Sequence, residues 1–172
     1  MDVALAFRDE YSGRPAGIGF RLISDADAEF LCVLYASTRA QELAPVAWPE
    51  EMKQHFLREQ FGFQHKHYQQ VYKDADFLLI QRNGVPIGRI YIDRAAEEIC
   101  LIDLALIPAC RGQGLGSALL AELIDEASRA QRGITLHVEP NNSAQHLYTR
   151  VGFKLVEHRG VYDFLRWTPA AG

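Results

Sequence analysis

The segment Arg111-Gly112-Gln113-Gly114-Leu115-Gly116, called the glycine turn below, places one cation among three glycines. It follows the apolar run 99–107 and precedes an amphipathic stretch over 114–132, so it predicts a strand-to-helix connection. Glycines let the backbone approach an anion closely, and free amides at a helix start point toward it while the dipole favours negative charge. The segment predicts a phosphate-binding turn, and its glycines alone leave an ordinary tight connection open.

Two other phosphate-binding patterns do not fit the glycine turn. A Walker loop would need Gly-Lys followed by Ser or Thr, which is absent from the segment. A dinucleotide-binding fold would carry its glycine-rich turn after the first strand of a parallel array, whereas several strands are predicted before this one.

One acidic residue interrupts the apolar run 99–107. Asp103 stands where a buried strand should carry an apolar side chain, and Glu98 lies at the start of the same strand. Counting the preceding hairpin about Ala96 puts Arg89 opposite Asp103, which favours a cross-strand ion pair as the structural interpretation of this aspartate.

Composition excludes several kinds of site. The net charge of -4 gives no overall attraction to polyanions, so nucleic acid is not an expected partner. Cys32, Cys100 and Cys110 are odd in number and widely spaced, which argues against a disulfide framework and a zinc site. The six histidines form no helical i, i+4 pair, and His65 and His67 would diverge on a helix, so no metal is expected.

The start of the chain carries no basic region or apolar run typical of a leader, and no stretch approaches the ~20 apolar residues of a membrane span. We therefore expect a cytoplasmic protein without a membrane partner. At 172 residues, one domain is expected over 18–172, with 1–17 as an N-terminal arm of uncertain order.

Period and capping patterns predict the elements that position these residues. Ser24, followed by acidic residues, is typical of a helix N-cap, Asn83-Gly84 of a hairpin turn, and Gly133 of a helix C-terminus. The expected strands are 19–23, 77–80, 87–92, 99–107, 134–138, 153–156 and 162–167, and the expected helices are 24–39, 49–71, 114–132 and 143–151. The apolar strand 99–107 should lie inside the sheet with both faces covered.

Pro108, the glycine turn, the run from Asn141 to Tyr148, and Val151-Gly152-Phe153 occur in an order that resembles the GNAT N-acetyltransferase superfamily. The resemblance covers Phe20 to Trp167. It implies an α/β fold of the α+β type: a mixed, mostly antiparallel sheet, splayed between strands four and five and flanked by helices. It also implies acetyl-coenzyme A as the co-substrate, bound in the split.

The resemblance further implies roles for individual residues. Tyr148 would protonate the departing thiolate of coenzyme A, with a buried core aromatic as the structural alternative. Cys110 stands where the family more often has a bulky residue, and no nucleophilic role is assigned to it because the family usually transfers the acetyl group directly. The residues implied to bind the co-substrate are Leu106, Ile107, Arg111, Gly112, Gln113, Gly114, Leu115, Gly116, Ser117, Asn141, Ala144 and Tyr148.

The implied acceptor is a primary amine of a small molecule or a protein, which must lose a proton before it attacks because its pKa is ~10.4. Asp103, Glu98 or a water relay could accept that proton. The residues expected to shape the acceptor side are Trp48, Phe56, Gln60, Gln64 and Tyr68.

Three further points stay open in the sequence. A domain of this fold could bind acyl-coenzyme A as a sensor or interaction module without turnover. The glycine turn could instead hold a different phosphate ligand. A homodimer is one oligomeric state that the sequence leaves open.

Overall fold

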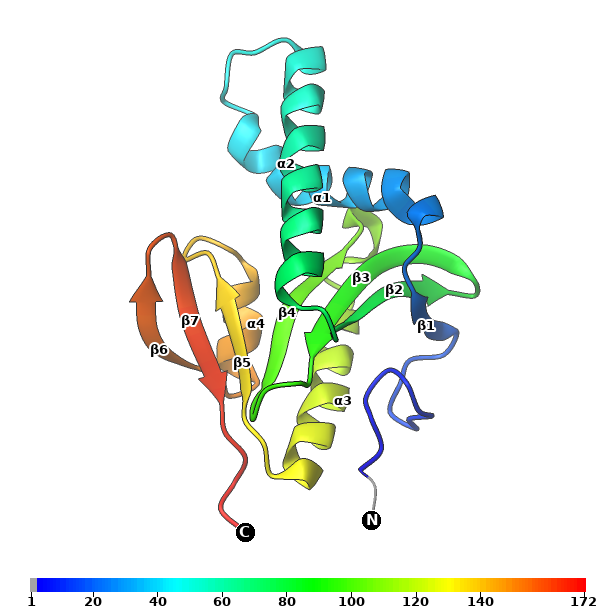
Figure 1. Ribbon diagram of the computed structural model, residues 1–172, viewed down its shortest axis with the longest axis vertical. Coiled ribbons are helices and arrows are strands. Elements are labelled where there is room, and N and C mark those ends of the chain that lie inside the picture. The colour runs from blue at the N-terminus through cyan, green and yellow to red at the C-terminus, as the bar shows by residue number, and fades with distance from the viewer. Residues whose placement is uncertain (1–2) are drawn as a thin grey trace.

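The computed structural model describes residues 3–172, and Met1 and Asp2 lie outside the described residues. One seven-stranded sheet runs in the order β1-β2-β3-β4-β5-β7-β6, and all neighbours are antiparallel except β4 and β5 (Figure 1). The strands are β1 (Ile18–Leu22), β2 (Asp76–Arg82), β3 (Val85–Asp93), β4 (Ile99–Leu106), β5 (Ile134–Val138), β6 (Lys154–Arg159) and β7 (Tyr162–Trp167). The predicted mixed, mostly antiparallel sheet is confirmed.

Alternate residues of each strand point to opposite faces of the sheet, and helices cover both of these faces. On β2, Leu79 packs in a core cluster with α1 and α2, whereas Leu78 and Ile80 belong to the larger cluster that contains α3. The N-terminal end of α2 extends beyond the sheet (Figure 1). The helices are α1 (Ala28–Leu43), α2 (Glu50–Val71), α3 (Leu115–Ala130) and α4 (Ala144–Arg150), with short 3-10 turns η1 (Asp25–Asp27) and η2 (Pro108–Cys110).

The two parallel strands separate soon after they meet. β4 and β5 pair only through Ile99 with Ile134 and Cys100 with Thr135, and from there the strands diverge (Figure 1). Beyond these two pairs, the facing edges of β4 and β5 are therefore not hydrogen-bonded to each other, and the space between them is called the opening below. This is the predicted splay between strands four and five.

The same divergence changes the surroundings of β4. The strand lies inside the sheet as predicted, but Ile102, Asp103, Leu104 and Leu106 remain half-exposed. The expectation that both faces of 99–107 are covered therefore fails for these residues, including Leu104 and Leu106, which pack against the cluster that contains α3.

A β-bulge shifts the register that the sequence predicts for Arg89. Asp103 lies opposite Tyr91, and Arg89 lies opposite Ala105. The hairpin is centred between Ala96 and Glu97 rather than on Ala96, since Asp93 pairs with Cys100, and a bulge at Ile102 of β4 shifts the pairing by one further residue. The predicted Cα pairing of Arg89 with Asp103 is therefore wrong. The ion pair itself forms diagonally across the strands, with 2.5 Å between Arg89 Nη2 and Asp103 Oδ2.

The C-terminal end of α3 also differs from the prediction. Gln131, with φ at 52°, takes the left-handed position that Gly133 was expected to fill. Gly133 serves close packing instead, because a Cβ there would lie 2.6 Å from Glu98 Oε2 and 3.2 Å from the carbonyl oxygen of Trp167.

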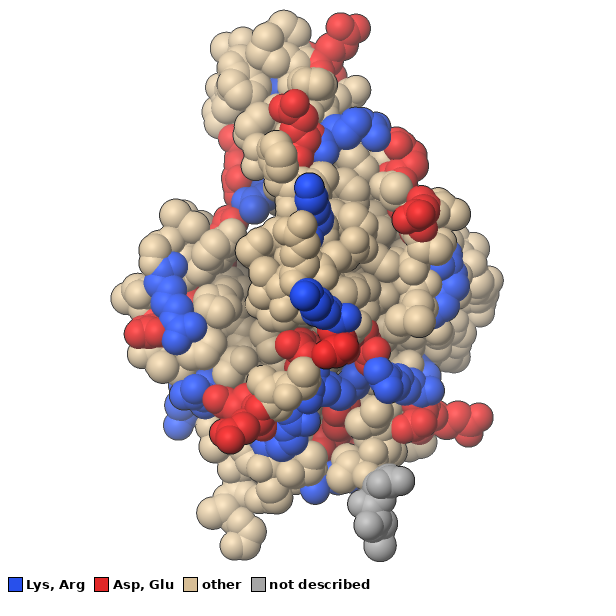
Figure 2. All heavy atoms as spheres, in the orientation of Figure 1, with Lys and Arg blue, Asp and Glu red and all other residues tan. Residues whose placement is uncertain are grey.

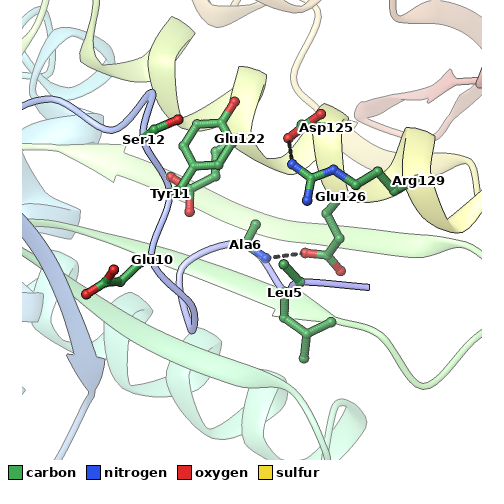
Figure 3. Close-up of a pocket in the computed structure, with 10 residues that line it drawn as sticks. Leu5, Ala6, Glu10, Tyr11, Ser12, Glu122, Asp125, Glu126 and Arg129 are labelled. Carbon is green, nitrogen blue, oxygen red and sulfur yellow. Dashed lines mark hydrogen bonds and ion pairs between the residues drawn. The ribbon is translucent and has the colours of Figure 1, made fainter. Parts of the chain in front are cut away.

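Residues 3–17, whose order the sequence left open, pack against α3. Ala6 and Phe7 are buried. The Ala6 amide donates to Glu126 Oε2 at 2.6 Å (Figure 3), and the Phe7 amide donates to Glu122 Oε1 at 2.8 Å. Arg14 pairs with Glu122 at 2.6 Å. Beside this contact lies a cavity of about 240 Å³ whose wall includes Tyr11 and Asp125.

On the side drawn in Figure 2, acidic and basic side chains are interspersed. None of the helices within residues 3–172 has the combination of length and apolar character that crossing a membrane requires.

Candidate functional site

The glycine turn folds as a left-handed loop at the start of α3. Gly112 and Gly114 have φ of 71° and 83°, a region that side chains rarely adopt, and Gly114 is the N-cap of the helix. A Cβ on either glycine would meet no atom within 4 Å. These two glycines are needed for backbone conformation, and they leave open space beside the turn.

The amides of residues 112 to 117 have no hydrogen-bond acceptor within residues 3–172. The first amide of α3 with a backbone partner is that of Ala118, which donates to the carbonyl oxygen of Gly114 at 3.0 Å. A helix start leaves such donors unpaired, and the helix dipole adds partial positive charge there. This run of free donors can bind an anion.

Side chains of the turn point back into the protein. Arg111 Nε donates to the carbonyl oxygen of Leu106 at 2.9 Å, and its Nη2 donates to Ser37 Oγ at 2.9 Å. Gln113 Nε2 donates to the carbonyl oxygen of Ala109 at 2.8 Å. These bonds fix the backbone of the turn while the charge of Arg111 stays close to it.

Helix α4 docks on the first turn of α3. A Cβ on Gly116 would lie 3.2 Å from Leu147 Cδ2, so this glycine permits close packing of the two helices. Arg150 Nη2 donates to Ser117 Oγ at 2.9 Å. Ala144 and Leu147 pack against the same core cluster.

The open edge of β4 presents backbone groups toward β5. The Ile107 amide donates to the carbonyl oxygen of Ile87 at 2.8 Å, so Ile107 faces β3. Since the groups of successive residues alternate sides, those of Leu106 and Leu104 face the opening. Of the two residues predicted to contact the co-substrate here, Leu106 presents its amide on that edge while its carbonyl oxygen accepts from Arg111, and Ile107 faces β3.

Tyr148 lies on α4 within the larger core cluster. Its side chain is buried and its ring packs edge-on against Phe153, with 5.6 Å between centroids. Burial raises the pKa of the Tyr148 hydroxyl above its usual value, and the charge of Asp103 contributes in the same direction. The hydroxyl is therefore protonated at neutral pH and can act as a donor.

On the other face of the sheet, Asp103 belongs to a polar cluster shared by three elements. Arg89 Nη2 on β3 donates both to Asp103 Oδ2 on β4, at 2.5 Å, and to Gln64 Oε1 on α2, at 2.8 Å. The Asp103 side chain is 19% exposed, whereas that of Arg89 is 3% exposed. Within the pair, the carboxylate is the group that reaches solvent.

Aromatic rings surround this cluster. The Arg89 guanidinium lies 5.0 Å from the centroid of the Tyr91 ring, and Tyr68 contacts Tyr91 at right angles with 6.2 Å between centroids. Burial first and the charge of Asp103 second raise the pKa of Tyr68. The structure thus brings together Gln64, Tyr68 and Asp103 from the predicted acceptor side.

Other predicted residues lie elsewhere. Trp48 and Phe56 stack edge-on with each other, 5.5 Å between centroids, and Phe56 is two helical turns from Gln64. Gln60 is partly buried one turn from Gln64, and Asn141 is exposed in the loop after β5. Glu98 lies where β4 and β5 are paired and binds Arg166, with 2.8 Å between Oε2 and Nε.

Sequence reasoning missed the double role of Arg89 and the place of Tyr91. The polarity of Arg89 within a strand was the available signal, but its bond to Gln64 depends on how α2 crosses the sheet. No pattern in the sequence gives that crossing.

Among residues 3–172, His, Cys, Asp and Glu side chains form no group of three that could hold a metal ion. Cys110 is buried, and its sulfur accepts a long contact of 3.8 Å from Arg82 Nη1.

Comparison with known sequences places these features in a family. The model of the acetyltransferase (GNAT) family matches residues 38–153, well over half of the chain. A [ribosomal protein bS18]-alanine N-acetyltransferase of Haemophilus influenzae is 33% identical over 85 residues, 49% of this chain and 58% of that protein. The chain thus matches less than two thirds of that relative's length.

Solved structures give the same fold. The PaiA N-acetyltransferase of Thermoplasma acidophilum, in complex with coenzyme A, matches with a TM-score of 0.66 at 23% identity, over 88% of this chain and 98% of that one. Arabidopsis thaliana Naa50, in complex with the bisubstrate analogue CoA-Ac-MVNAL, matches with a TM-score of 0.54 at 17% identity, over 89% and 99%. At these identities the likeness concerns the fold alone.

Proposed function

The chain belongs to the acetyltransferase (GNAT) family, and from that premise we propose that it transfers the acetyl group of acetyl-coenzyme A directly to a primary amine in a ternary complex. The observation that carries the proposal is the run of free amides at residues 112 to 117, next to the opening between β4 and β5. A pyrophosphate is the ligand that such a donor array fits.

The residues at the turn suit coenzyme A in two respects. The space beside Gly112 and Gly114 lets phosphate oxygens approach the backbone, and the open edge at Leu104 and Leu106 offers peptide groups to an amide-containing arm. Acetyl-coenzyme A supplies an acetyl group activated as a thioester. The chain's own residues then have to position the amine and move two protons.

Tyr148 is proposed to give the first proton. Its hydroxyl is protonated across the neutral range, because burial holds its pKa above the ~10 of a free tyrosine. It can therefore donate to the departing sulfur, whose thiol pKa is ~8.5, as the charge on that sulfur develops. As the nitrogen–carbon bond forms and the carbon–sulfur bond breaks, the proton moves from Tyr148 Oη to sulfur.

Asp103 is proposed to take the second proton, from the attacking amine. Its carboxylate is partly exposed among the predicted acceptor-side residues Gln64 and Tyr68, and it influences the ionisation of Tyr148. Glu98 is less suited, because both its oxygens bind Arg166 at the closed end of the β4–β5 pair. A water between Asp103 and the amine would serve the same path.

The acceptor is proposed to be the amino group of a peptide or of a small molecule in the cytoplasm. The Haemophilus influenzae relative is named for alanine of a ribosomal protein, which favours including peptide N-termini among the candidates. Tyr68 and Gln64 provide the apolar and polar surface against which such an acceptor would lie.

The test is a panel of acceptors incubated with acetyl-coenzyme A, with free thiol measured over time and the acetylated product identified by mass spectrometry. The panel includes peptides that begin with alanine, polyamines, amino acids and aminoglycosides. We expect thiol release that depends on one acceptor class and falls in Tyr148→Phe.

Tight binding of coenzyme A with no turnover across a broad panel would support a non-catalytic acyl-coenzyme A sensor instead. Absence of coenzyme A binding, measured by calorimetry, would contradict both functions.

A further inference from the structure

Arg89 is a buried cation whose position has a specific consequence for the acceptor side. Its side chain is 3% exposed, and within residues 3–172 its Nε and Nη1, together with the hydroxyl of Tyr91, have no hydrogen-bond partner. Two unpaired buried donors on a charged group cost stability, and an apolar side chain of similar volume often serves a core as well or better. Core stability alone therefore gives a poor account of this arginine.

Within residues 3–172, Nη2 is the nitrogen of the Arg89 guanidinium that has hydrogen-bond partners, and it connects β4 and α2, the two elements that border the acceptor side. Nη2 bonds Asp103 Oδ2 on β4 and Gln64 Oε1 on α2, so the two acceptor oxygens lie side by side on the same donor. β4 and α2 have no other hydrogen bond or ion pair with each other among residues 3–172. Arg89 therefore supplies a hydrogen-bonded link between β4 and α2, in addition to the packing of Tyr68 on Tyr91 and the contact of Tyr72 with Cys100.

We propose that Arg89 is a positioning residue that sets the orientation of Asp103 and Gln64 toward the acceptor amine. This inference rests on the proposed acetyltransferase function. Arginine has donors only, so its bond requires the oxygen of the Gln64 amide to face it and turns the NH2 of Gln64 away. Its bond to Oδ2 leaves Oδ1 of Asp103 without a partner within residues 3–172.

The acceptor side then presents one donor, Gln64 Nε2, beside one acceptor, Asp103 Oδ1. This arrangement complements an amine that carries a hydrogen-bond acceptor near its nitrogen. A carbonyl group adjacent to the amine-bearing carbon has that chemistry, whereas a simple alkylamine lacks it.

Four variants separate positioning from folding. Arg89→Lys keeps the charge but replaces the planar guanidinium, whose two Nη2 hydrogens have fixed directions, by a rotatable ammonium on a shorter side chain, and Gln64→Leu removes only the α2 partner. Arg89→Met tests the apolar replacement. Gln70→Leu, an exposed position on the same helix, is the matched control for Gln64→Leu.

Steady-state kinetics with the acceptor, calorimetry with coenzyme A, and hydrogen exchange of α2 are measured on the full chain. In Arg89→Lys we expect kcat/KM for the acceptor to fall about 10–100-fold while coenzyme A affinity is unchanged. Gln64→Leu should raise the acceptor KM with little change in kcat, and should speed exchange in the C-terminal half of α2. Gln70→Leu should change neither.

Wild-type kinetics in Arg89→Lys would overturn the proposal, and so would equal effects of Gln64→Leu and Gln70→Leu. If the wild-type protein acetylates no acceptor, the proposed function fails, and the exchange measurement still decides whether Arg89 fixes α2. If Arg89→Met folds and turns over like the wild type, Arg89 has no positioning role.

Discussion

Gly116 on α3 lies so close to Leu147 on α4 that a Cβ would be 3.2 Å from Leu147 Cδ2. Gly116→Val should therefore push α4 away and destabilise the protein by about 1–3 kcal/mol. Adding Leu147→Ala should relieve the crowding, so that the double variant loses less than the two single losses together. Urea unfolding of the four proteins measures this coupling, and strictly additive losses would show that the two residues do not press on each other.

Gly114 offers a cleaner test of the anion site than Gly116, because a Cβ there meets open space. Gly114→Asp and Gly114→Asn are nearly equal in shape, and both tolerate the left-handed φ of 83° better than other residues. Only the aspartate adds negative charge beside the free amides. Calorimetry should show that Gly114→Asp binds coenzyme A at least about tenfold more weakly than Gly114→Asn, and equal affinities would remove the glycine turn from the binding site.

Arg94 links the N-terminal segment to α3 and to the start of β2. It pairs with Glu126 at 2.7 Å and Asp76 at 2.6 Å and donates to the carbonyl oxygen of Ala6 at 2.8 Å, all largely buried. Arg94→Met removes this partner from two buried carboxylates and should cost about 3 kcal/mol, the lower end of the range for a broken buried pair, because Asp76 keeps Arg8 and Glu126 keeps the Ala6 amide.

The matched control is Arg129→Met, which removes an exposed i, i+4 pair with Asp125 and should cost less than about 1 kcal/mol. Denaturant unfolding measures both variants. Similar losses would mean that the buried network contributes no more than a surface pair.

Protonation of Asp27 should account for part of the loss of folding stability at acid pH. Hydrogen bonds from Arg21, foremost, and from the Ser24 amide lower the pKa of Asp27 to about 2. Because the folded pKa lies below the unfolded value of ~3.9, this stabilisation is present above pH ~4 and is lost as pH falls toward 2. It amounts to at most about 2 kcal/mol, since Arg21 is 41% exposed. Thermal melts should show a shallower acid decline in Asp27→Asn, and an unchanged slope would contradict the assignment.

The helices, strands and turns were predicted well where the conformation of a residue depends mainly on its neighbours in the sequence. Asn83-Gly84 forms the hairpin turn with φ of 51° and 81°, and the apolar stripe of 114–132 becomes α3, whose leucines are buried. The glycine turn was located correctly between strand and helix for the same reason, since its conformation depends on its own glycines.

Features that depend on distant contacts were not predictable. The bulge at Ile102 of β4 helped to move Arg89 opposite Ala105, and nothing in the local pattern of β4 marks an extra residue. The order of residues 3–17 depends on Glu122 and Glu126, more than a hundred residues away. The return of Arg111 to the Leu106 carbonyl likewise depends on how the turn folds back on β4.

Tyr148 is the residue on which the proposed chemistry depends most. Tyr148→Phe keeps the ring and its packing against Phe153 but deletes the hydroxyl, so kcat should fall roughly 10²–10⁴-fold. Coenzyme A affinity should change little, because the free amides of residues 112 to 117 are untouched. Kinetics should remain sequential, without an acetyl group trapped on buried Cys110.

The pH dependence gives a second check on the same residue. Burial holds the pKa of Tyr148 above its usual value, so the donor should stay protonated and no activity loss from its ionisation should occur below pH ~10. A raised folded pKa also means that stability is complete below pH ~10 and declines above it, and Tyr148→Phe should lessen that alkaline decline. If Tyr148→Phe turned over at the wild-type rate where chemistry is rate-limiting, Tyr148 would be a core aromatic without an acid role.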